Sequence, residues 1–162
     1  MKTRGGALAY GLVIASTLWP LLLVAAVRQQ MAGPSTWSAA VYLAASRICH
    51  QRDERSFHSD GVKWPVCGRC AGLYAAAPIG AIVALARRRR PSRARTVIPL
   101  VLASLPTAVT LGAEWLRVLP VSNLARALAA IPSGLAVTYA IVHVAGGAWE
   151  SRMPRRSPGS IR

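Results

Sequence analysis

Two short segments of the sequence contain all three cysteines of the chain. In the first, Cys49 directly precedes His50; in the second, Cys67 and Cys70 form a Cys-x-x-Cys knuckle. Such a knuckle directs two sulfur atoms to one centre, and a further cysteine and histidine across a loop complete a tetrahedral Cys₃His zinc site. The sequence therefore predicts a metal site, most simply a zinc site, with Cys49, His50, Cys67 and Cys70 as its ligands.

The same sulfur atoms allow two other interpretations. If Cys67 and Cys70 begin a helix, the positive helix end and Arg69 favour a thiolate, as in thiol-disulfide oxidoreductases, with Cys49 as a partner thiol. Alternatively, a metal or a disulfide only fastens this loop to the rest of the protein. The sequence contains no nucleotide or flavin motif, no nucleophile elbow and no paired carboxylates, so it leaves open whether the chain is an enzyme.

The composition indicates that a membrane bundle must position this site. Of the 162 residues 53% are apolar, and 20 lysines and arginines against 5 acidic residues give a net charge of +15. Nucleic-acid-binding domains place such charge on a polar fold, whereas here long uncharged runs separate short arginine clusters. We therefore expect the lipid bilayer, and no nucleic acid, as the partner of this chain.

Four uncharged runs are long enough, or nearly so, to cross a bilayer, whose hydrocarbon core needs about 20 helical residues. We expect a single transmembrane domain, residues 1–150, followed by a basic, disordered tail, residues 151–162. A cleaved signal peptide is the alternative for the first run, because Lys2 and Arg4 precede it. The four predicted spans are residues 7–27, 70–86, 97–116 and 124–146.

The first loop, residues 28–69, contains the cysteines and one further predicted helix. Residues 35–48 have the pattern of a helix capped by Ser35 or Thr36, too short to span and therefore expected at the membrane surface. The predicted fold class is an all-α membrane protein: four transmembrane helices with a short interfacial helix in the first loop. Within the fourth span, the sequence Pro132-Ser133-Gly134 predicts a kink or a local break.

Small residues follow one face of the second span. Gly72, Ala76 and Gly80 lie at i, i+4 and i+8, a spacing that lets another helix approach closely. A monomeric bundle of four helices has little room for a pore, so any transport function would require a homodimer.

The arginines predict the orientation of the spans. Positive charge near span ends stays on the cytoplasmic side, and the loop between the second and third spans, residues 87–95, contains six arginines. Together with both termini, that side has twelve basic residues against eight on the other. We therefore expect a multi-pass protein of a bacterial inner membrane, with cytoplasmic termini and an extracytoplasmic Cys/His loop.

One acidic residue is expected near the cysteines on the same side of the membrane. Glu114 ends the third span, and a carboxylate beside the bilayer is costly unless it has a partner. We expect it to hydrogen-bond His50 or to complete the metal site; a simple ion pair with Arg117 is the alternative.

Three arginines on that side suggest a second alternative function. Guanidinium groups bind phosphate through two parallel hydrogen bonds, so a basic pocket here would make the protein a lipid-headgroup or partner-binding module. By contrast, we expect His58 and Asp60 to be ordinary loop residues. The arginines concerned are Arg55, Arg69 and Arg126.

Several of these segments together resemble a known family. Cys49-His50-Gln51, then Arg55-Ser56-Phe57, then Cys67-x-Arg-Cys-x-Gly-x-Tyr74 are similar to the signature of a bacterial and archaeal family of small integral membrane proteins, domain of unknown function 2085. The resemblance extends to Gly134 and implies a multi-span membrane protein with a common Cys/His site, without an established activity. Family members often carry an aspartate in the third span where this sequence has Thr110, so an acid there would have to come from Glu114.

Overall fold

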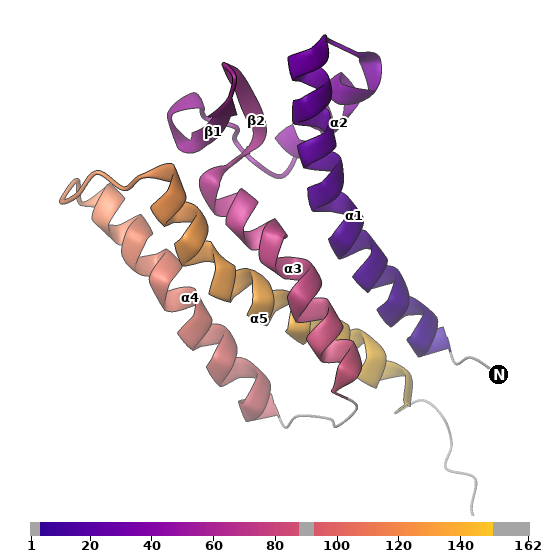
Figure 1. Cartoon of the computed structure of the whole chain (residues 1–162). Helices are drawn as coiled ribbons and strands as arrows, with labels where there is room; N and C mark the ends of the chain where they lie inside the picture. The colour runs from indigo at the N-terminus through magenta and orange to yellow at the C-terminus, as the bar shows by residue number, and fades with distance from the viewer. Residues whose placement is uncertain (1–3, 88–92, 151–162) are drawn as a thin grey trace, which may run out of the picture.

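The computed structural model describes residues 4–87 and 93–150, most of which form four long helices side by side (Figure 1). All four contain a stretch long and apolar enough to cross a membrane, which confirms the four predicted spans and the all-α class. The predicted tail, residues 151–162, lies outside the described residues. The long helices are α1 (Arg4–Ala32), α3 (Gly68–Ala86), α4 (Arg93–Trp115) and α5 (Asn123–Glu150).

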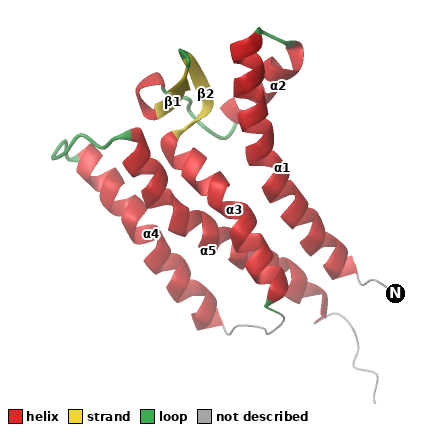
Figure 2. Ribbon diagram, in the orientation of Figure 1, coloured by secondary structure: helices red, strands yellow, loops and turns green. Residues whose placement is uncertain are grey.

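The segment between α1 and α3, residues 33–67, forms a small cap at one end of the bundle (Figure 2). The predicted short helix is present as α2 (Thr36–Ser46), and the Ser35 hydroxyl caps it by accepting a hydrogen bond from the backbone N–H of Ser38. The sequence analysis did not predict the rest of the cap. It consists of a 3₁₀ turn, η1 (Asp53–Arg55), and two antiparallel strands, β1 (Ser56–Ser59) and β2 (Val62–Cys67).

The closest helix contact lies between α3 and α5, and glycine makes it possible. A Cβ atom added to Gly72 would overlap the carbonyl oxygen of Ala127, and one added to Gly80 would overlap that of Leu135. Ala76, between these glycines, is buried. From the other helix, Gly134 lies equally close to the backbone of Leu73. The small face of α3 therefore packs on α5, inside one chain.

Helix α5 continues through the Pro132-Ser133-Gly134 sequence as one helix rather than breaking there. Proline removes a backbone donor from the helix, and the neighbouring helix α4 supplies polar partners at the same level. The Thr107 hydroxyl donates to the carbonyl of Ala129 at 2.8 Å, and the Ser133 hydroxyl donates to the carbonyl of Ala103 at 3.0 Å. These bonds join α4 to α5 inside the apolar bundle.

A separate apolar cluster attaches the cap to the bundle. Leu23 of α1, Ala45 of α2 and Val66 of β2 are buried together with Cys49. Trp19 and Tyr74 pack against this cluster, with their rings edge to face at a centroid distance of 6.2 Å. Cys49 is thereby placed next to the beginning of α3.

Candidate functional site

The three cysteines come together where β2 passes into α3. Cys49 lies in the loop after α2, Cys67 ends β2, and Cys70 lies in the first turn of α3. Their three Sγ atoms lie within 4.8 Å of one another, and the backbone N–H of Cys67 donates to Cys49 Sγ at 3.2 Å. Tetrahedral bonds of about 2.3 Å to zinc would place sulfur atoms about 3.8 Å apart. The cluster is therefore close to the geometry that a metal ion requires, and it can hold one.

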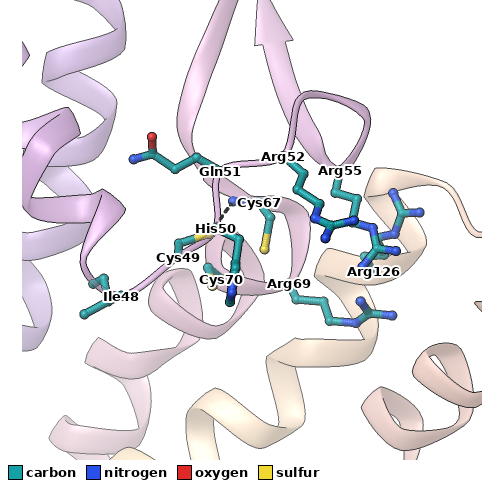
Figure 3. A pocket seen from close by; sticks show the side chains of 10 residues that line it. All are labelled: Ile48, Cys49, His50, Gln51, Arg52, Arg55, Cys67, Arg69, Cys70 and Arg126. Carbon is teal, nitrogen blue, oxygen red and sulfur yellow. Dashed lines mark hydrogen bonds between the residues drawn. The ribbon is translucent and has the colours of Figure 1, made fainter. Parts of the chain in front are cut away.

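His50 lines the same cavity as the three cysteines but does not belong to their close group (Figure 3). The structure thus brings together three of the four predicted ligands. The backbone around His50 is irregular, and Gln51 after it has a positive φ of 47°.

Hydrogen bonds from Gln51 fix this irregular stretch. Its side-chain amide donates to the carbonyls of Tyr42 at 2.9 Å and Pro65 at 2.8 Å, joining α2 to β2. The Lys63 ammonium group donates back to the Gln51 carbonyl at 3.1 Å. This clamp positions Cys49 opposite Cys67, and the sequence analysis did not single it out. The Cys-His-Gln sequence was the feature that could have pointed to Gln51.

The surroundings of Cys67, which lies just before the second span, lower the pKa of its thiol. It is the N-cap residue of α3, with extended backbone geometry. A hydrogen bond from the Cys70 side chain is the largest influence on its pKa. That bond lowers the pKa, burial raises it, and hydrogen bonds from the backbone N–H groups of Cys70 and Arg69 lower it further. The net result is a pKa of about 5 for the Cys67 thiol. The lowered pKa favours the thiolate of Cys67, the form that binds metals and attacks disulfides.

A cavity of about 370 Å³ opens beside the sulfur atoms. The cysteines lie on one side of it and a group of guanidinium side chains lies on the other (Figure 3). No acidic residue lines this cavity among the residues that the structure describes. The arginines that line it are Arg52, Arg55, Arg69 and Arg126. Arg52 is an addition to the predicted set.

Glu114 lies at this end of the bundle, as predicted, but its partners differ from those expected. Its carboxylate accepts from Arg126 Nε at 2.5 Å and lies 3.1 Å from Arg69 Nη2. Arg55 Nη1 is more distant, at 4.0 Å. Among the described residues, neither His50 nor Arg117 pairs with this carboxylate. The close packing of α3 on α5 explains the difference, because it brings arginines of both helices to the end of α4.

A second set of hydrogen bonds joins the cap to α5. The Asn123 side-chain amide donates to the carbonyl of Ser56 at 2.8 Å, and its oxygen accepts from Arg126. Arg126 also donates to the backbone carbonyl of Glu54 at 3.4 Å. Arg126 is thus fixed by α4, α5 and the cap together.

Thr110, which the resemblance sets against an aspartate of the family, does not reach this network. Its hydroxyl donates to the carbonyl of Thr107 in its own helix at 3.0 Å. Glu114, one helical turn later, provides the acidic group at the end of α4.

Comparison with known proteins agrees with this architecture. A segment of 46 residues is 44% identical to an uncharacterized protein of Methanocaldococcus jannaschii; it covers 28% of this chain and 30% of that protein. The chain thus spans about a third of the length of the relative that it matches. No solved structure matches the chain. The model of the family described as predicted membrane protein (DUF2085) matches residues 49–140, more than half of the chain and all of the cysteine cluster. The chain therefore belongs to the DUF2085 family of predicted membrane proteins.

Proposed function

We propose that this membrane protein binds a zinc ion through the thiolates of Cys49, Cys67 and Cys70. The observation that carries the proposal is the convergence of three Sγ atoms within 4.8 Å at the end of the bundle. Three protein ligands leave one position of a tetrahedral zinc ion free. The cavity beside the sulfur atoms, which His50 and the arginines line, would give a further ligand access to that position.

The free position distinguishes two classes of zinc site. Structural sites are closed by four protein ligands, whereas catalytic sites keep one position for water or substrate. A three-thiolate site beside a cavity belongs to the second class, so an exchangeable ligand completes the coordination. His50, on the cavity wall, would then contact that ligand rather than the ion.

Elemental analysis of the detergent-purified protein tests the proposal. We expect about one zinc per chain in the wild type and none in Cys67→Ser, because two thiolates and a hydroxyl bind zinc far more weakly. His50→Ala should retain zinc, and His58→Ala, whose ring lies outside the cavity, serves as the matched control. A chain that contains no zinc after purification and reconstitution, with or without reductant, would contradict the proposal.

Thiol-disulfide exchange is a second candidate, favoured by the lowered pKa of Cys67 at the start of α3. In this reaction the Cys67 thiolate attacks a substrate disulfide and releases one substrate thiolate. The Cys70 thiol then loses its proton and attacks Cys67 Sγ, which releases the second substrate thiolate. The protein pair is oxidised to a disulfide and the substrate disulfide is reduced by two electrons; Cys70 supplies one proton to the released thiolates, and water supplies the other. Two thiols that appear only after reduction, in a zinc-free chain, would favour this candidate.

We propose further that the cap faces the extracytoplasmic side of an inner membrane. The basis is the excess of arginine at the opposite ends of the spans. In a bacterial host, green fluorescent protein fused to the C-terminus should fluoresce, and alkaline phosphatase at the same position should be inactive. The reverse pattern would place the cysteines in the cytoplasm.

A further inference from the structure

The cavity beside the cysteines has a large surplus of positive charge. Four arginines line it, and the nearest carboxylate, that of Glu114, lies behind two of them. The acidic residues of η1 do not compensate this charge. Asp53 is exposed and pairs with His58 at 3.1 Å, and Glu54 is exposed and contributes only its backbone carbonyl to Arg126. Like charges gathered around one space repel each other unless an anion lies between them.

The four arginines are not equally available to such an anion. Arg126 is held by Glu114, Asn123 and the Glu54 carbonyl. Arg55 is 4.0 Å from Glu114, beyond hydrogen-bond distance, and its side chain is 38% exposed. Arg52 is exposed and has no ion pair among the described residues. Arg52 and Arg55 therefore have donors to spare.

Arg69 adds a donor that the described residues leave unsatisfied. Its Nε atom is buried and has no hydrogen-bond partner among them, whereas Nη2 forms an ion pair with Glu114 at 3.1 Å. A buried donor without an acceptor is costly, and such groups in native structures usually meet a ligand or water. Arg69 lines the cavity in which Arg52 and Arg55 also lie.

We propose that this cavity binds a phosphate group, held by the guanidinium groups of Arg52 and Arg55 and supported by Arg69. A planar guanidinium group donates two parallel hydrogen bonds to two oxygen atoms of a phosphate. Several guanidinium groups around one cavity therefore favour an anion that has several oxygen atoms. The volume of about 370 Å³ exceeds what one phosphate group fills and leaves room for an organic part of a phosphate ester. The cavity lies at the ends of the spans, where both phospholipid headgroups and soluble phosphate esters have access.

This proposal changes the predicted arginine set and does not depend on zinc. The sequence suggested Arg55, Arg69 and Arg126 as phosphate ligands, whereas Arg126 is already bound to Glu114, Asn123 and the Glu54 carbonyl, and Arg52 takes its place. The sulfur atoms lie on the opposite side of the cavity (Figure 3). Phosphate binding should therefore persist when the metal ligands are removed.

Binding of inorganic phosphate and of a phosphate monoester, glycerol 3-phosphate, to the purified protein tests the proposal. The protein is prepared in neutral detergent and chloride buffer, and binding is followed by calorimetry. Arg52→Gln/Arg55→Gln should weaken binding at least about tenfold, because charge-assisted hydrogen bonds are the strong ones. Arg28→Gln/Arg47→Gln removes the same charge from two exposed arginines outside the cavity and should leave binding unchanged. Thermal melting establishes that each variant is folded. Arg55→Lys keeps the positive charge but lacks the planar guanidinium group, so it should lose less phosphate affinity than the double variant.

Liposome flotation distinguishes a lipid from a soluble phosphate as the source. The protein is offered vesicles of phosphatidylcholine alone or with phosphatidic acid, and lipids that co-purify are identified by mass spectrometry. Retained phosphatidic acid that is lost in Arg52→Gln/Arg55→Gln supports the proposal with a lipid as ligand; binding of glycerol 3-phosphate alone supports it with a soluble ester. Equal loss in both double variants, or no binding of any phosphate compound, overturns it. Binding that disappears in Cys67→Ser but persists in Arg52→Gln/Arg55→Gln would place the anion on the metal and also overturn it.

Discussion

Helix α3 takes part in two regions that differ in how they use polar groups. Along its length it meets α5 at Gly72 and Gly80, where backbone lies against backbone and there is no space for a ligand. At its first turn, Cys67, Cys70 and Arg69 surround a cavity that contains thiols and an unsatisfied donor. The first region provides stability, and the second has the means for chemistry.

The two regions meet at Gly68, and the contact there shows how the packed region positions the residues of the site. A Cβ atom there would lie 2.6 Å from the carbonyl oxygen of Asn123, so the first turns of α3 and α5 are in close contact. This approach brings Arg69 of α3 and Arg126 of α5 to the same carboxylate, that of Glu114. Packing without polar groups therefore positions the charged groups of the site.

The largest expected effect comes from a single methyl group in the packed region. Gly72→Ala places a Cβ atom on the Ala127 carbonyl, so the helices must separate; we expect unfolding to become easier by about 3 kcal/mol, the upper part of the range for overpacking. Gly112→Ala is the control, because nothing lies within 4 Å of its Cβ position. Thermal melting in detergent measures both. Equal melting temperatures for the two variants would show that α3 and α5 do not pack this closely.

Glu114→Gln should give the next largest effect, because it acts at the junction of the two regions. The change leaves Arg69 and Arg126 without a counter-charge, and we expect a loss of about 2 kcal/mol of stability. Phosphate should restore part of the melting temperature by supplying negative charge. Asp53→Asn, which alters an exposed carboxylate outside the cavity, is the control. A Glu114→Gln protein as stable as the control would exclude the ion-pair network.

Asn123→Ala removes one hydrogen bond between α5 and the cap, to the Ser56 carbonyl, and one within α5, from Arg126. Because this position borders water, we expect a smaller loss of about 1 kcal/mol, with zinc content unchanged. Hydrogen exchange should be faster in β1, whose Ser56 loses its partner, and not in the middle of α3. Uniformly faster exchange along α3 would mean that cap and bundle are not separable regions.

His58→Gln is expected to have the smallest effect. His58 and Asp53 are 3.1 Å apart with side chains 41% and 76% exposed, and such exposed pairs contribute less than about 1 kcal/mol. Zinc content, phosphate affinity and melting temperature should all match the wild type. A loss of zinc in this variant would place the metal at the hairpin instead of at the sulfur cluster.

The bundle was predictable from the sequence because the bilayer imposes both length and composition on its spans. All four spans were found, but α1 runs from Arg4 to Ala32 and extends beyond the predicted residues 7–27. Hydropathy measures where the apolar run ends, whereas a helix continues through residues such as Gln29 and Gln30 that favour it. The ends of the helices could therefore be located only from the structure.

The strands of the cap were missed although one local signal was present. Asp60 and Gly61 have φ angles of 48° and 78° and form the two-residue connection between Ser59 and Val62. An Asp-Gly pair is typical of such hairpins. The flanking strands are short and β2 contains Pro65, so their alternation is too weak to identify them.

The site was only partly predictable, for a different reason. The Cys-x-x-Cys spacing indicated two sulfur atoms at one centre, and Cys49 was the remaining cysteine. The partners of Glu114 depend on how three helices pack, which one sequence does not show. Arg52 has no feature in the sequence that separates it from the other charged residues of the first loop; the cavity identifies it.

Zinc K-edge X-ray absorption on the purified protein tests the central claim, a three-thiolate metal site, most directly. The account predicts three sulfur atoms at about 2.3 Å and one oxygen or nitrogen atom at about 2.0–2.1 Å, and the same sulfur shell in His50→Ala. A shell of oxygen and nitrogen alone, or a zinc-free protein whose Cys67 and Cys70 form a disulfide, would contradict it.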